Sequence, residues 1–289
     1  MVTIMDYLKF KQIFNGIIFE KSKTTLLEKI ADYPTRYIGL FRPTKPKAKI
    51  LQNLLQSHEI SFGDAFELVI EEYLKENGFT ILNKKFVSDN NDDLNVDQCF
   101  SKENKIYFVE QKIRDDHDST KKRGQIDNFE KKLNEIIKAK EENNLKGFFY
   151  FIDPELKKNR KYYSDILDDI SKSYGVELHL FYGDELFKFL NMENAWTEIL
   201  DYLRQWKEEI PELPETNFDL NAEISFEEIK TLSPAYYRKL FVNDEIFNEI
   251  ILTIFPEKKT LKLLLNYFKE KSNEKKIYKT LFETLQQKI

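Results

Sequence analysis

The segment from residue 147 to residue 183 leaves few choices of fold. It opens with the apolar run Gly-Phe-Phe-Tyr-Phe-Ile at 147–152, which is typical of a strand buried on both faces of a sheet. A helix is expected to follow as far as Tyr174, and a second largely apolar strand to begin at Val176. A strand, a helix and a strand within this distance predict a crossover connection between parallel neighbours. The chain should therefore contain a sheet flanked by helices.

A predicted β-hairpin lies upstream, over residues 94–112. Its two halves carry strand-type residues, and the polar stretch at 101–105 between them is typical of a turn. If the turn centres on Glu103 and Asn104, Asp97 faces Glu110 directly across the pair. Lys112 lies two positions further on and therefore shares a face with Glu110.

This pairing of carboxylates predicts a metal site. Asp97 and Glu110 would repel each other unless a cation lies between them. Hard oxygen ligands that are left partly open suit Mg²⁺, which keeps waters and phosphate oxygens among its ligands. Lys112 could then orient a water or stabilise charge on a phosphate. The alternative is a solvated strand face that carries a cross-strand ion pair.

Asp97 together with Glu110-Gln111-Lys112 resembles the D…(D/E)-x-K signature of the PD-(D/E)xK nucleases, although Val96 stands where that family often has proline. Two flanking segments add to the resemblance. Residues 62–67 open a predicted helix similar to the one that carries an extra glutamate, here Glu67, in that family. Residues 113–125 resemble the polar, DNA-facing loop of type II restriction endonucleases. The resemblance covers roughly residues 60–190.

The resemblance implies a fold, a reaction and a set of partners. The expected fold is an α/β (α+β) restriction-endonuclease-like mixed β-sheet core flanked by helices, with helical N- and C-terminal extensions. The expected activity is Mg²⁺-dependent hydrolysis of double-stranded DNA at a specific sequence. Asp97 and Glu110 would bind the metal, Lys112 would assist the attacking water, and Glu67 would be a weaker fourth member. A homodimer and a cognate DNA methyltransferase are further expectations.

Two polar stretches are the expected DNA contacts. The segment at 42–49 contains two prolines and is predicted to be extended, and it is either an arm on the DNA backbone or a solvated linker. Its basic residues are Arg42, Lys45, Lys47 and Lys49. The run after the hairpin supplies the other candidates, which are Arg114, Asp116, His117, Ser119, Thr120, Lys121, Lys122, Arg123 and Gln125. The neighbouring pair Lys131-Lys132 is interpreted as solvated charge on a helix that begins at Ile126.

Composition bounds the remaining possibilities. A net charge of −5 is the wrong sign for a general nucleic-acid binder, so DNA contacts would have to come from local basic surfaces. The single cysteine, Cys99, excludes an internal disulfide and a cysteine-based zinc cluster. The sequence contains neither a signal-peptide pattern nor a long apolar run, which predicts a cytoplasmic protein without a membrane span.

Three regions are expected along the chain: a helical N-terminal region with the basic arm at 1–60, the catalytic core at 61–190, and a helical C-terminal subdomain at 191–289. An extended, acidic break at 210–215 separates the last helices from what precedes them. Two other functions are compatible with the same residues. One is a repair or transposon-end nuclease of the PD-(D/E)xK type, and the other is a DNA-binding protein without catalytic activity.

Overall fold

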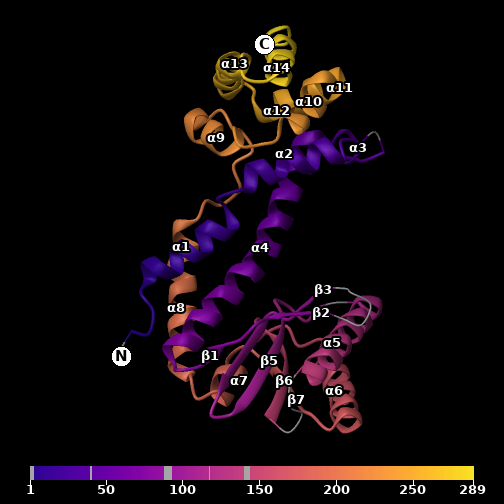
Figure 1. Ribbon diagram of the computed structural model, residues 1–289, viewed down its shortest axis with the longest axis vertical. Helices are drawn as coiled ribbons and strands as arrows, with labels where there is room; N and C mark the ends of the chain where they lie inside the picture. The colour runs from indigo at the N-terminus through magenta and orange to yellow at the C-terminus, as the bar shows by residue number, and fades with distance from the viewer. Residues whose placement is uncertain (1–2, 40, 88–92, 117, 140–143) are drawn as a thin grey trace. The chain divides into compact units, whose positions relative to one another are not determined.

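The computed structural model describes residues 3–39, 41–87, 93–116, 118–139 and 144–289 (Figure 1). The chain divides into two compact units, each built from segments that are distant in sequence. The first unit contains Met1–Phe14 and Gly63–Glu209, and the second contains Asn15–Phe62 and Ile210–Ile289. Residues 63–190 of the expected catalytic core thus fall within the first unit.

The first unit is organised around a five-stranded mixed sheet in the order β1-β4-β5-β6-β7, which confirms the predicted fold class. Its strands are β1 (Thr80–Ile81), β4 (Gln98–Lys102), β5 (Lys105–Lys112), β6 (Leu145–Phe151) and β7 (Glu177–Tyr182). The first three are antiparallel, whereas β5, β6 and β7 run parallel. The predicted crossover between the strands at 147 and 176 is therefore present, with helix α6 (Arg160–Tyr174) between them.

The hairpin has the predicted register. Gln98 pairs with Val109, which places Asp97 opposite Glu110 just beyond the end of β4. Glu103 and Asn104 form the turn with φ angles of 50° and 60°, as a tight two-residue hairpin loop requires.

The strands around the hairpin differ from the prediction in two ways. Both hairpin strands continue through the polar stretch up to the turn, whereas the residues around Leu94 form a separate strand, β3 (Asp93–Asn95), that pairs with β2 (Lys85–Val87). The sequence also predicts one strand over residues 79–87, but the structure has two short strands there, β1 and β2. The Asn83 side chain causes this break, because it accepts a hydrogen bond from the Lys85 amide and donates one to the Lys85 carbonyl. The polar residues at 88–93 predict a turn, but this segment lies almost entirely outside the described residues.

Helices cover both faces of the sheet. Helices α5 (Ser119–Ala139) and α6 pack on the face that carries Phe108 and Phe149 (Figure 1). Aromatic side chains line the opposite face, where Phe148 contacts Tyr107, Phe181 and Phe189. Phe189 ends α7 (Asp184–Phe189), and α8 (Glu193–Glu209) and the part of α1 (Tyr7–Ile18) up to Phe14 complete this unit.

A single helix, α4 (Pro46–Glu76), replaces the predicted extended arm from Pro46 onward and continues through the helix predicted to open at residues 62–67. Pro46 is compatible with a helix start, because the first turn needs no amide hydrogen there. Gly63 does not break the helix. The apolar stripe resumes beyond it with Ala65 and Phe66, both fully buried. The first part of α4 belongs to the second unit and the last part to the first unit.

The second unit is helical. Its elements, besides the first part of α4, are α2 (Ser22–Asp32), α3 (Thr35–Ile38), α9 (Ala222–Ile229), α10 (Pro234–Val242), α11 (Asp244–Ile246), the π-helical turn η2 (Phe247–Ile251), α12 (Leu252–Ile254), α13 (Lys259–Lys271) and α14 (Lys276–Gln286). Their apolar faces form one core that includes Leu27, Phe241 and Phe268. The irregular stretch after α8 confirms the break predicted at 210–215. None of the helices formed by the described residues is long and apolar enough to cross a membrane.

Candidate active site

The structure brings Asp97, Glu110 and Lys112 together at the end of β5. The Lys112 ammonium donates to Glu110 Oε1 at 2.7 Å and lies 3.7 Å from Asp97 Oδ2. Asp97 Oδ2 also accepts the Gln111 amide hydrogen at 2.5 Å, which fixes the carboxylate against the hairpin backbone. The side chains of Asp97 and Lys112 are 18% and 27% exposed, whereas Glu110 is 2% exposed. The cluster is thus anchored in the core and open on one side.

Lys132 is a fourth member that the sequence interpretation missed. Its ammonium, on α5, donates to Glu110 Oε2 at 2.5 Å, and the side chain is 10% exposed. The interpretation of Lys132 as a solvated helix charge was therefore wrong. Its position in the helix was the available signal, because Lys132 lies three residues after Phe129 and four before Ile136, within the apolar stripe of α5.

Burial and mutual repulsion set the charge state of this cluster. Burial, followed by the negative charge of Glu110, raises the pKa of Asp97 above its usual value. Burial alone would lower the pKa of Lys112, but Glu110 and Asp97 more than compensate and raise it. Lys112 is therefore a cation at neutral pH, suited to donate hydrogen bonds and to neutralise charge.

Glu67 lies within electrostatic range of the cluster. Two glutamine side chains, on the hairpin face opposite Asp97 and Glu110, connect the hairpin to α4. Gln98 donates to the Glu67 carbonyl at 2.6 Å, and Gln111 donates to the Gly63 carbonyl at 3.3 Å. Burial, followed by the negative charge of Asp97, raises the pKa of Glu67 to about 8. At neutral pH and without a metal, Glu67 is thus largely protonated.

This raised pKa predicts a pH-dependent stability difference for Glu67→Gln. The proton on Glu67 favours the folded state at low pH, and this contribution is lost as the pH rises from 4.5, the usual pKa of a glutamate, through about 8. Glutamine does not titrate, so Glu67→Gln should match the wild type near about pH 4 and be more stable above about pH 8. We expect an advantage of roughly 1–3 kcal/mol there, after allowing for the exposed part of the side chain.

Urea unfolding at both pH values in chelator measures this difference. The exposed Glu76 lies on the same helix, and Glu76→Gln is the matched control. An equal stability of the wild type and Glu67→Gln at both pH values would contradict a buried, charge-coupled position for Glu67.

The donor set suits a hard divalent cation that retains waters. Among the described residues, no group of three or more His, Cys, Asp or Glu side chains lies close enough together to hold a metal by itself. Two carboxylates are sufficient for Mg²⁺ when water and phosphate oxygens complete its shell. Asp97 and Glu110 can supply these ligands, since Asp97 is partly exposed and the negative charge of Glu110 disfavours ionisation of Asp97 as long as no cation lies between them.

The expected DNA contacts fall in both units. In the second unit, Arg42 and Lys45 are exposed before α4, and Lys47 and Lys49 lie in its first turn. The predicted extended conformation of this arm was therefore wrong from Pro46 onward.

The polar run after the hairpin enters a helix earlier than predicted, since α5 begins at Ser119. Asp118 Oδ1 caps it by accepting the amide hydrogens of Thr120 at 3.1 Å and Lys121 at 2.9 Å. The candidates that are exposed here are Arg114, Asp116, Ser119, Thr120, Lys121 and Arg123. His117 lies outside the described residues.

The remaining candidates for DNA contacts, Lys122 and Gln125, interact with other side chains of the first unit. Gln125 Oε1 accepts the Tyr163 hydroxyl at 2.7 Å, and Lys122 donates to Asn159 at 3.3 Å and lies 4.1 Å from the centre of the Tyr162 ring. Asn159 also binds both oxygens of the fully buried Asp115. These contacts connect the start of α5 to α6 and give Gln125 and Lys122 a structural role.

A family model matches most of this chain. The model of the family described as "Type II restriction endonuclease, HinfI" matches residues 7–95 and 80–207, which together cover more than half of the chain and include all four members of the cluster. A match was found neither among curated proteins nor among solved structures. The chain therefore belongs to the HinfI family of type II restriction endonucleases.

Proposed function

We propose that this protein is a Mg²⁺-dependent endonuclease that hydrolyses phosphodiester bonds of double-stranded DNA at a specific sequence. The observation that carries the proposal is the cluster of Asp97, Glu110 and Lys112 at the open end of β5 in a restriction endonuclease family member. The same cluster supports a place among the PD-(D/E)xK nucleases.

Each residue has a distinct task in this reaction. Asp97 and Glu110 would hold Mg²⁺, which when bound supplies Lewis-acid stabilisation of the charge that develops on the phosphate. Lys112 remains protonated, so it orients a water and donates hydrogen bonds to the phosphate rather than accepting a proton. Lys132 keeps Glu110 in position through its ion pair. Glu67, close to Asp97, is the fourth candidate.

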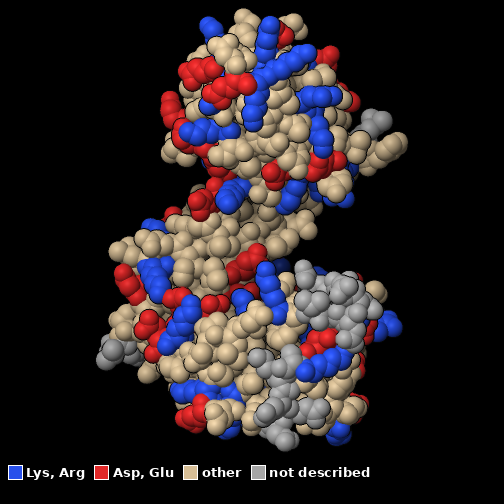
Figure 2. Space-filling model, viewed as in Figure 1, with Lys and Arg blue, Asp and Glu red and all other residues tan. Residues whose placement is uncertain are grey.

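The DNA is expected to contact local basic surfaces. Figure 2 shows Lys and Arg interspersed with Asp and Glu over the face that is drawn, in keeping with the net charge of −5. The exposed residues of α5 and the residues around the start of α4 are the candidates for phosphate contacts. A homodimer would cut both strands of a symmetric site, and a cognate methyltransferase would protect host DNA in the cytoplasm.

Digestion of plasmid and phage DNA with and without Mg²⁺ tests this function directly. We expect discrete fragments in Mg²⁺ and intact DNA in chelator, because the carboxylates of Asp97 and Glu110 then lack their cation. Gel electrophoresis of the products is the measurement. A smear of random fragments would argue against a specific site, and intact DNA in Mg²⁺ would argue for binding without catalysis.

A further inference from the structure

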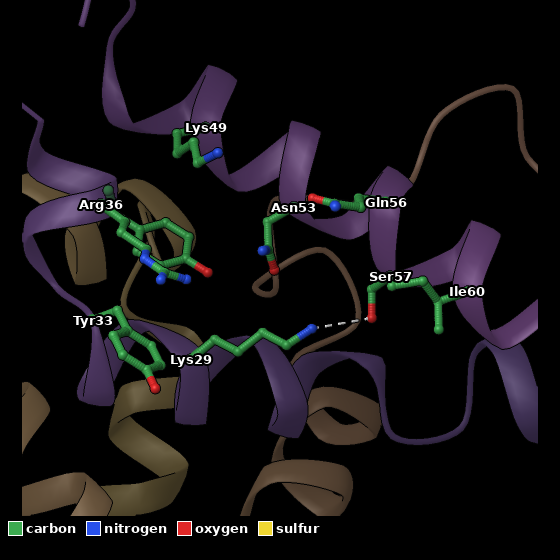
Figure 3. Close-up of a pocket in the computed structure, with 9 residues that line it drawn as sticks. Lys29, Tyr33, Arg36, Lys49, Asn53, Gln56, Ser57 and Ile60 are labelled. Carbon is green, nitrogen blue, oxygen red and sulfur yellow. Dashed lines mark hydrogen bonds between the residues drawn. The ribbon is translucent and has the colours of Figure 1, made fainter. Parts of the chain in front are cut away.

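The second unit contains a cavity of about 290 Å³ formed by α2, α3 and the first part of α4 (Figure 3). Its lining residues are Lys29, Tyr33, Arg36, Tyr37, Lys49, Asn53, Gln56, Ser57 and Ile60. No residue of the first unit contributes to it, and the cluster around Glu110 is therefore not part of it. The cavity therefore needs an explanation of its own.

Three cations line this cavity. The Lys29 side chain extends along the cavity, and its ammonium donates to Ser57 Oγ at 3.4 Å (Figure 3). Lys49 donates to Gln52 Oε1 at 2.8 Å. The Arg36 guanidinium lies 4.3 Å from the centre of the Tyr33 ring. In the part of the chain that the structure describes, none of the three forms an ion pair, and no Asp or Glu lines the cavity. An anionic group would supply the missing charge.

One face of α4 contributes neutral hydrogen-bonding groups next to Lys49. Lys49, Asn53 and Ser57 follow one another at four-residue spacing, so their side chains lie on one side of the helix, and Gln56 adjoins them. The apolar side chains of Ile50 and Leu54 are buried elsewhere on the helix. Carboxamides both donate and accept, which is what the edge of a nucleobase requires.

An aromatic ring completes the set of groups. Tyr33 is 51% exposed, and the Arg36 guanidinium covers part of its ring. Tyrosine rings and planar guanidinium groups are the surfaces on which proteins stack unpaired bases. A phosphate, a base edge and a base face would thus each meet a suitable partner within a cavity of this size.

We propose that this cavity binds one nucleotide of a DNA strand, with its phosphate at Lys29, Arg36 and Lys49 and its base against Tyr33 and the carboxamides of Asn53 and Gln56. The site is separate from the cleavage chemistry, and it rests on the proposed function only for the choice of DNA as the source of the nucleotide.

Asn53→Asp tests the proposal with almost no change of shape. A carboxylate at this position repels a phosphate and loses the amide donors, so the affinity for a labelled single-stranded oligonucleotide should fall at least about tenfold. Asn273→Asp makes the same chemical change at an exposed position between α13 and α14 and should alter the affinity less than about twofold. Fluorescence anisotropy in chelator measures both, so that no DNA is cleaved during the titration.

A second labelled oligonucleotide, which is abasic but keeps its phosphates, distinguishes binding of a nucleotide from binding of a phosphate alone. The wild type should bind the abasic strand more weakly than the normal strand, and the ratio of the two affinities should shrink in Asn53→Asp. Arg36→Ala should lower the affinity for both oligonucleotides. Because Arg36 is exposed, this variant keeps the test valid if Asn53→Asp does not fold. Equal binding of both strands by the wild type would overturn the proposal, and so would unchanged affinity in correctly folded Asn53→Asp and Arg36→Ala. Because these measurements need no Mg²⁺, a failure of the proposed cleavage leaves their result unaffected.

Discussion

Lys112→Ala is expected to lower the rate of DNA cleavage by at least about a hundredfold while the protein stays folded. The loss follows from the position of the ammonium, which is 2.7 Å from Glu110 and open to solvent on one side. Of the two lysines in the cluster, Lys112 is the more exposed to solvent, and Lys132 is largely buried. The alanine substitution therefore removes the lysine that a substrate can reach. The charge that develops on the phosphate would then lack its protein cation.

Asp97→Asn should have an effect of the same size for a different reason. The amide is nearly isosteric and can still accept the Gln111 amide hydrogen, but it is a much weaker ligand for Mg²⁺. Cleavage rates at saturating Mg²⁺, with circular dichroism as a check of folding, measure both variants. Lys105→Ala is the matched control, because Lys105 is an exposed lysine at the other end of β5. Cutting at a near wild-type rate by Lys112→Ala or Asp97→Asn would remove that residue from the proposed mechanism.

The hairpin was predictable because its rules are local. A two-residue turn at Glu103 and Asn104 fixes the register, and the register alone places Asp97 opposite Glu110. The parallel pair β6 and β7 was predictable for a similar reason, since a short crossover between two apolar strands leaves few alternatives.

The course of α4 was not predictable from local signals. Prolines at 43 and 46 and the glycine at 63 favour breaks, yet the helix begins at Pro46 and continues through Gly63. Tertiary packing outweighs these preferences, because Ile50 and Leu54 are buried in one unit and Phe66 and Val69 in the other. The cavity was not predictable either, because Lys29, Arg36 and Asn53 come from three helices.

Lys132 shows what a charge interpretation misses when it ignores helical position. Lys131 and Lys132 are neighbours in sequence, but Lys131 is exposed and Lys132 is buried against Glu110. The sequence placed both on a solvated face. A glutamate with both oxygens bonded to lysine ammonium groups is possible in the core only because those two cations accompany it.

Lys132→Met is therefore expected to destabilise the protein by about 2–4 kcal/mol, because it leaves Glu110 buried with a single cation. The estimate lies slightly below the usual cost of breaking a buried ion pair, since Lys112 still neutralises part of the charge. Methionine retains most of the apolar volume, so the loss reports on the ion pair and not on a cavity. Urea unfolding of the wild type and the variant at neutral pH is the measurement.

Two further variants make this prediction specific to Glu110. Lys131→Met changes the neighbouring, exposed lysine in the same way and should shift the free energy of unfolding by less than about 0.5 kcal/mol. Glu110→Gln combined with Lys132→Met should recover part of the lost stability, because the uncompensated charge is then absent. If Lys132→Met is as stable as Lys131→Met, or if the double variant is no more stable than Lys132→Met alone, Lys132 does not stabilise the fold by neutralising Glu110. The position of Glu110 at the proposed metal site would then depend on Lys112 and on the hairpin backbone alone.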